Sequence, residues 1–241
     1  MTHQANRREF MKGALLSPAV LALAAQARAA IGAAAGADAA VRALPRGKIG
    51  ELSVSRLLLG GNLLTHFTHS RDLMYVYKLA EHYNTEAKIL ETLALAEQNG
   101  INTLVVHTVP AILETLRKYR YDLGGKMQWI ICPTAPVEPG LEAYRKQVEE
   151  LMDMECDAIY LWGVHADRLT GDQRVDLLAE AVALPKEYGV PSGLGAHDLN
   201  VVVEAEARGA DPDFYIKTFH HHDYPTAPRP EEVEGLSLIH I

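Results

Sequence analysis

Short runs of β-branched and aliphatic residues alternate with helical stretches along most of the chain, and this alternation constrains the fold more than any other feature. Between these runs, residues 85–99, 141–154 and 174–188 place apolar side chains at three- and four-residue spacing, as amphipathic helices do. Such alternation predicts βαβ units and a parallel sheet that is buried on both faces. Six runs read as strands, at residues 56–61, 102–108, 127–134, 158–163, 192–197 and 214–220.

Two α/β architectures fit this alternation, a doubly wound open sheet and a closed barrel. A doubly wound sheet would carry a Gly-x-Gly-x-x-Gly turn after its first strand, and Leu59-Gly60-Gly61-Asn62 does not supply it. A (β/α)8 TIM barrel needs about eight units. We therefore predict an α/β fold of the TIM-barrel type over residues 47–235, cut short after about six β/α units.

The N-terminus resembles a twin-arginine secretion signal. Arg7 and Arg8 are followed by Phe10 and Lys12, and the apolar stretch 13–25 is too short to span a bilayer stably. Small residues on either side of Arg28 suit a signal peptidase that cuts before Ala30. We predict a signal at residues 1–29 and an Ala/Gly-rich linker at 30–46. The resemblance implies export by the twin-arginine translocase to the periplasm or beyond, without a stable membrane anchor, and folding before export.

Charge and cysteine content narrow the possible partners. Without the signal the chain has 19 basic and 30 acidic residues, a formal charge of −11, which argues against nucleic acid or an anionic membrane as partner. Cys132 and Cys156 are the only cysteines, and we expect both to be buried free thiols. Residues 236–241 read like the translation of a sequencing-library adapter, so we predict a non-native tail there.

Several segments resemble the aldo/keto reductases. Residues 48–61 are similar to that family's N-terminal hairpin and first strand, 96–102 to the approach to its second strand, and 157–165 to its fourth strand, which ends in a catalytic histidine. Residues 191–198 and 213–220 are similar to its fifth and sixth strands. The resemblance implies a barrel fold and carbonyl reduction with NADPH, with His165 in the place of the family's histidine.

The rest of that family's catalytic set is not retained. Val105 and Val106 stand where an aspartate should end the second strand, and a lysine is replaced near Cys132. The positions that would hold the nicotinamide read His197-Asp198 and Ile216. Without a tyrosine acid, hydride transfer would leave an alkoxide unprotonated. NADPH is therefore an alternative cofactor here rather than the leading one.

Histidines gather at the ends of the predicted strands. Outside the signal and the tail the chain has nine, and only His82 falls in a predicted helix. The carboxyl ends of barrel strands are where such folds build active sites. Imidazoles meeting there beside carboxylates would suit Zn, Mn, Fe or Co, and a metal-free sugar pocket or purely structural roles are the alternatives. The histidines at or just past strand ends are His66, His69, His107, His165, His197, His220, His221 and His222.

Alternation along the strands extends this prediction. Gly193, Gly195 and His197 share one face, and glycine beneath a histidine would leave room for a ligand. Residues 159, 161, 163 and 165 share one face of the preceding strand. Lys217 lies within a strand, which is costly for a charged side chain unless it is paired or functional. It suits either a Schiff-base role or a stem tucked under the outer helices.

These observations lead to one leading function and two alternatives. We expect an exported enzyme that acts on a sugar or sugar-derived carbonyl by metal-assisted proton transfer, as isomerases, epimerases and lyases do. The alternatives are an NADPH-dependent reductase with an altered catalytic set and a carbohydrate-binding barrel without catalysis. The predicted catalytic residues are His165 and His197, and the predicted metal ligands are His107, His165, His197, His220, Asp198 and Asp223.

Overall fold

A parallel sheet of six strands forms the centre of the protein. The computed structural model describes residues 44–68 and 73–218, and in this part of the chain the strand order follows the sequence, β3-β4-β5-β6-β7-β8. Each strand pairs in parallel with the next, as right-handed crossover connections allow. The strands are β3 (Leu59–Gly60), β4 (Thr103–His107), β5 (Gln128–Cys132), β6 (Ala158–Leu161), β7 (Ser192–Ala196) and β8 (Phe214–Lys217).

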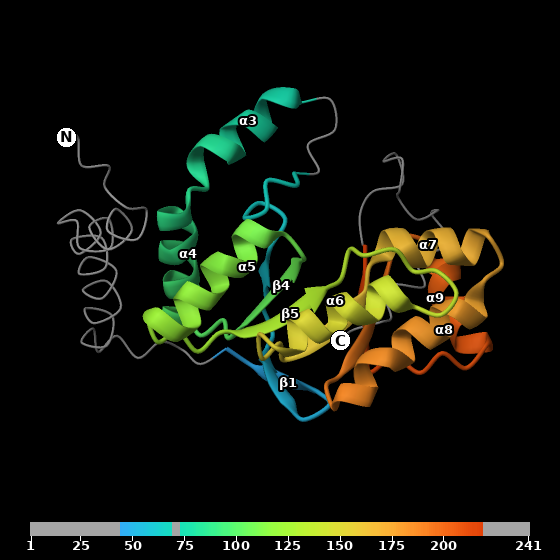
Figure 1. The fold of residues 1–241 in the computed structure, drawn as a ribbon. Helices are drawn as coiled ribbons and strands as arrows, with labels where there is room; N and C mark the ends of the chain where they lie inside the picture. Colours follow the sequence, from blue (N-terminus) through green and yellow to red (C-terminus); the bar gives the residue numbers. More distant parts are fainter. Residues whose placement is uncertain (1–43, 69–72, 219–241) are drawn as a thin grey trace, which may run out of the picture.

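Helices connect these strands and cover one face of the sheet (Figure 1). The helices predicted at residues 85–99, 141–154 and 174–188 are confirmed at residues 86–98, 142–152 and 175–188, the last as an α-helix followed by a 3-10 turn. Thr85 accepts a hydrogen bond from the Lys88 amide at the start of α4, and Gly100 and Gly189 adopt left-handed backbone angles just past two helical segments. The helices are α3 (Met74–Tyr83), α4 (Glu86–Gln98), α5 (Pro110–Arg117), α6 (Glu142–Met152), α7 (Gly163–Gly171), α8 (Val175–Ala183) and α9 (Leu199–Ala207), with a π-helical turn η1 (Lys118–Asp122) and a 3-10 turn η2 (Leu184–Tyr188).

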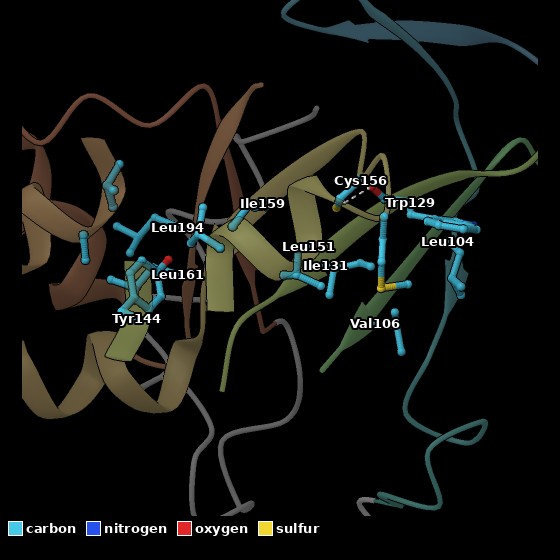
Figure 2. Packing of buried hydrophobic residues seen from close by; sticks show 14 of the residues in the cluster. Leu104, Val106, Trp129, Ile131, Tyr144, Leu151, Cys156, Ile159, Leu161 and Leu194 are labelled. Carbon is cyan, nitrogen blue, oxygen red and sulfur yellow. Dashed lines mark hydrogen bonds between the residues drawn. The ribbon is translucent and has the colours of Figure 1, made fainter. Parts of the chain in front are cut away.

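The two faces of the sheet bury different side chains because residues alternate along each strand. The face toward the helices carries fully buried aliphatic residues that pack on Tyr144 and Leu151 of α6 (Figure 2). The opposite, concave face forms a smaller cluster. The helix-side residues are Leu104, Val106, Ile131, Ile159, Leu161 and Leu194; the concave cluster contains Ile130, Cys132, Ala158 and Tyr160, with Val105, Trp162, Phe214 and Ile216 packed against it.

An antiparallel hairpin closes the amino end of the concave face. It consists of β1 (Arg46–Ile49) and β2 (Leu52–Ser55), and lies at the bottom of Figure 1. Asn102 holds it in place: its side-chain oxygen accepts from the Ser55 amide at 2.8 Å and its side-chain nitrogen donates to the Ser53 carbonyl at 2.7 Å. Ile49 and Leu52 of the hairpin pack against the concave cluster, so the amino end of this face is covered.

The prediction of a (β/α)8 TIM barrel cut short after about six units is wrong, because the described residues form a six-stranded parallel half-barrel sheet with a small antiparallel sheet. All six predicted strands are present, but they form a half-barrel in which β3 and β8 are the two ends of the strand order. Closing a barrel takes about eight strands, and the described residues supply six parallel ones. Local sequence patterns locate strands, whereas closure depends on how many strands share the sheet.

Other predictions fall outside the described residues. These are the signal at 1–29, most of the linker at 30–46, and the tail at 236–241, with His69, His220, His221, His222 and Asp223. The linker prediction ends where β1 begins, at Arg46. Among the helices of residues 44–68 and 73–218, none is long and apolar enough to cross a membrane.

Candidate active site at the carboxyl edge of the sheet

His197 and Asp167 form the most specific contact at this edge. His197 follows the last residue of β7, and Asp167 lies in α7, which follows the neighbouring strand β6. The Asp167 carboxylate accepts from the His197 backbone amide at 3.0 Å and from the ring nitrogen Nδ1 at 2.5 Å. Both side chains are about 30% exposed, so the pair is anchored in the protein and still reaches solvent.

This contact fixes which ring nitrogen of His197 can act as a base. A carboxylate can only accept, so Nδ1 carries the proton that it donates to Asp167. The neutral ring then has its lone pair on Nε2. A carboxylate behind Nδ1 also stabilises the imidazolium that forms when Nε2 takes up a proton.

His165 lies in the first turn of α7, not on a strand as predicted. The strand β6 ends at Leu161 and the helix begins at Gly163. Ile159 and Leu161 belong to the helix-side core, so the face that the sequence assigned to His165 is not the concave one. The His165 ring stands edge-on to Trp162, with centroids 5.3 Å apart, and its Nε2 lies 3.4 Å from the Thr134 carbonyl oxygen. Burial lowers the pKa of His165, which keeps the ring neutral near pH 7.

His107 ends β4, as predicted, and lies on the concave side by alternation with Val105. It is the parallel partner of Cys132, and the Phe67 ring meets it edge-on with centroids 5.6 Å apart. Burial lowers the pKa of His107. The residue is therefore a neutral imidazole in a largely apolar setting.

The Cys132 thiol and the Tyr160 hydroxyl interact deeper on the same face. Burial raises the pKa of the Cys132 thiol to about 12 and raises the pKa of Tyr160. Both groups are therefore protonated at physiological pH. Cys156 is also buried and free, so the prediction of two buried thiols is confirmed.

The two glycines of β7 do not leave room for a ligand, contrary to the prediction. A methyl group added at Gly193 would lie 2.4 Å from the ring of Phe214. One added at Gly195 would lie 2.8 Å from the backbone nitrogen of Gly163. These glycines are required by the close packing of an aromatic ring and of the neighbouring backbone.

Asp198 is a helix cap. It precedes α9, and its side chain accepts a hydrogen bond from the Asn200 amide at 2.8 Å. N-capping is the ordinary role of an aspartate at this position. The predicted metal ligands His107, His165, His197 and Asp198 do not come together: within the described residues no three His, Cys, Asp or Glu side chains could hold a metal ion. His220 and Asp223 lie outside the described residues.

Lys217 lies beside the carboxyl end of β7. It is the parallel partner of Ala196, whose side chain belongs to the helix-side core, so its stem lies on that side of the sheet. Its ammonium donates to the His197 carbonyl at 2.6 Å and to the Thr218 carbonyl at 2.9 Å. These two hydrogen bonds hold the Lys217 nitrogen against the backbone at the end of the sheet, which favours the stem tucked under the outer helices over a Schiff-base role.

Asp167 is a candidate site residue that the sequence pattern does not indicate. The pattern places the candidates at strand ends and His165 on the strand, which leaves Asp167 outside the predicted site. An available signal was Gly163, which begins a helix two residues after the end of β6 and so carries residue 167 toward the neighbouring strand. In comparisons with protein-family models, curated proteins and solved structures, no match was found, so the likeness to aldo/keto reductases remains a prediction.

Proposed function

We propose that this protein is an exported enzyme that moves a proton on a sugar or sugar-derived carbonyl compound, with His197 as the acid–base group. The double contact between Asp167 and His197 is the observation that carries the proposal. An aspartate that holds both the backbone and the ring of a histidine fixes the tautomer and the orientation of the imidazole. This is the arrangement that general acid–base catalysis needs.

The reaction follows from the free Nε2 atom. Nε2 takes a proton from the carbon next to a substrate carbonyl, and the electron pair of that C–H bond passes into an enediolate. Asp167 stabilises the imidazolium during this step. Addition of a proton from solvent to the opposite face of the same carbon, with the Nε2 proton released to solvent, gives an epimer. Return of the Nε2 proton to the former carbonyl carbon gives an isomer, with the proton of the neighbouring hydroxyl passing to the former carbonyl oxygen. General acid–base catalysis of this kind contributes a rate factor of about 100 to 10,000.

His165 is the second acid–base candidate. It shares α7 with Asp167, and Trp162 and the Thr134 carbonyl hold its ring. A carbonyl only accepts, so the neutral ring donates from Nε2 and has its lone pair on Nδ1. Its lowered pKa means that it is available as a base at neutral pH.

No step is assigned to a metal or to NADPH, because the described residues do not fit either group. Asp198 is occupied as the cap of α9, and the His165 Nε2 atom faces a carbonyl oxygen. Ile216, at the position where the resemblance implies a nicotinamide contact, packs against the concave apolar cluster. Added metal ions and added NADPH are therefore separate samples in the experiment.

The experiment follows solvent exchange. The full chain is incubated in D2O with a panel of aldoses, ketoses and sugar-derived ketones, and NMR records loss of the proton signal next to the carbonyl. We expect exchange that depends on enzyme with at least one compound. Asp167→Asn should slow it by a factor of about 100, because the amide cannot hold the ring proton in the same way.

Asp172→Asn is the matched control, since Asp172 is exposed and caps the other end of the same helix. It should retain the wild-type rate. Wild-type exchange in Asp167→Asn, or no exchange with any compound, contradicts the proposal. Parallel samples with added Zn²⁺ or Mn²⁺, with chelator, and with NADPH separate metal-assisted chemistry and carbonyl reduction from the metal-free reaction.

A further inference from the structure

Large apolar side chains are exposed around α3 to an unusual extent. Leu63, Met74, Tyr75, Leu79 and Tyr83 are each between 57% and 67% exposed. At ~200 Å² for each side chain, they present roughly 600 Å² of surface to solvent. The largest apolar patch on a typical monomer is ~300–600 Å² and is often an interaction site.

These residues form one surface, which we call the α3 surface. Tyr75, Leu79 and Tyr83 are spaced by four residues and so form a continuous ridge along one side of the helix. Leu63 joins the end of this ridge because the Asn84 side chain, one residue past Tyr83, donates to the Leu63 carbonyl at 2.8 Å. Figure 1 shows α3 at the top of the view, away from the helices that cover the sheet.

Within residues 44–68 and 73–218, α3 has little contact with other helices and strands. Ala80 is its only buried residue, and Ala80 lies on the side next to the ridge. A ten-residue helix is marginal in water unless its apolar side is packed against something. The ridge therefore continues the apolar side of α3 from the buried Ala80 into solvent, where a partner could cover it.

We propose that the α3 surface is the contact through which two copies of this chain form a twofold-symmetric dimer. In an isologous contact the same surface of both copies meets, so the apolar ridge of one copy packs against the apolar ridge of the other. Rows spaced by four residues interdigitate when helices cross at about −50°.

Area and charge both favour a second copy. A standard interface buries ~800 Å² on each partner. The five side chains supply most of this area, and the half-exposed Leu73, which directly precedes α3, adds to it. The chain carries a formal charge of −8, which disfavours self-association over most of its surface. On α3 the charges of Lys78 and Glu81 neutralise each other at 2.9 Å, so two such surfaces can meet without net repulsion.

Analytical ultracentrifugation of the full chain, and of a form that starts at Ala30, tests the proposal at micromolar concentrations. We expect twice the monomer mass for both forms. Leu79→Lys should shift the protein to monomer, whereas Leu95→Lys should not. Leu79 and Leu95 are both leucines on helices and both are 59% exposed, so the two variants differ only in whether the change lies on the α3 surface.

A cysteine placed on the ridge gives a second measurement that does not depend on the stability of the lysine variant. In a twofold contact, Leu79→Cys should cross-link to its own copy with a short bismaleimide, while Leu95→Cys should remain monomeric on a denaturing gel. The native thiols Cys132 and Cys156 are buried and should not react. A monomeric wild type in both forms overturns the proposal, as does a dimer that Leu79→Lys leaves intact. A dimer of the full chain that is lost in the Ala30 form also overturns it, because the N-terminal residues would then be responsible.

Discussion

Replacing Arg120 by methionine should destabilise the protein more than any other substitution of a surface-reaching charge in the described residues. Arg120 lies in η1 and contacts the segments that lead into β5 and β6. Its guanidinium donates to the Glu155 carbonyl at 2.6 Å, to the Met127 carbonyl at 3.0 Å and to the Asp157 carboxylate at 2.8 Å. The same group lies 3.4 Å from the centroid of the Trp129 ring.

The size of the effect can be worked out from these contacts. The Arg120 and Asp157 side chains are 17% and 25% exposed, so solvent screens the pair only in part. The ion pair with its hydrogen bond contributes about 1–2 kcal/mol, the cation–π contact about 1 kcal/mol, and the two carbonyl contacts about 1 kcal/mol after water replaces the donor. These contributions overlap, and we expect a loss of about 3 kcal/mol in the free energy of unfolding.

Urea unfolding followed by circular dichroism measures this loss. Arg117→Met is the matched control, because Arg117 is exposed one turn earlier, and it should cost less than about 0.5 kcal/mol. Arg120→Lys should fall between the two, since a lysine keeps the charge but cannot bond three acceptors and stack on a ring at once. If Arg120→Met costs less than about 1 kcal/mol, or no more than Arg117→Met, the reasoning from these contacts is wrong.

Two further predictions concern the concave face. Gly193→Ala should lower the free energy of unfolding in urea by about 1–3 kcal/mol, because the new methyl group meets the Phe214 ring. Adding Phe214→Leu to the same chain should recover part of this loss. If Gly193→Ala has no effect, the Phe214 ring can move aside and the reasoning is wrong. Burial lowers the pKa of His107 from 6.5, so below about pH 6.5 the unfolded chain binds a proton that the folded chain does not. The free energy of unfolding therefore decreases as the pH is lowered through this range. His107→Gln should reduce the drop in melting temperature between about pH 7.5 and about pH 5.5, while the same change at the exposed His82 should not.

The sequence located the sheet well because its strands are buried on both faces. Runs such as 127–134 and 158–163 are apolar throughout, as strands between two packed layers must be, and both became strands. It did not locate α3, whose apolar residues follow no single core-facing stripe: Ala80 alone is buried, and Tyr75 and Leu79 face solvent. Helix signals in a sequence reflect burial in the same chain, and here the apolar side of the helix is left largely exposed.

The incorrect assignment to the TIM-barrel fold has a different origin. Each β/α unit specifies its own strand and helix and the parallel partner beside it, for example Gly195 with Ile216. Whether the two outer strands meet depends on the number of strands and their stagger around the axis. Neither quantity can be read from one unit, so the local pattern was correct and the global inference from it was not.

The sequence places the candidate histidines at the carboxyl edge of the sheet, but their number there says little about their chemistry. Their partners differ: His107 meets the edge of a Phe67 ring, His165 faces the Thr134 carbonyl, and His197 pairs with the Asp167 carboxylate. The edge of an aromatic ring packs against an imidazole but does not fix its tautomer. A carbonyl oxygen fixes the tautomer, but its partial charge stabilises an imidazolium only weakly. A carboxylate does both, because it accepts the Nδ1 proton and carries a full negative charge. The proposed acid–base role of His197 therefore rests on the chemistry of its partner, which lies thirty residues away and could be identified only once the start of α7 was known.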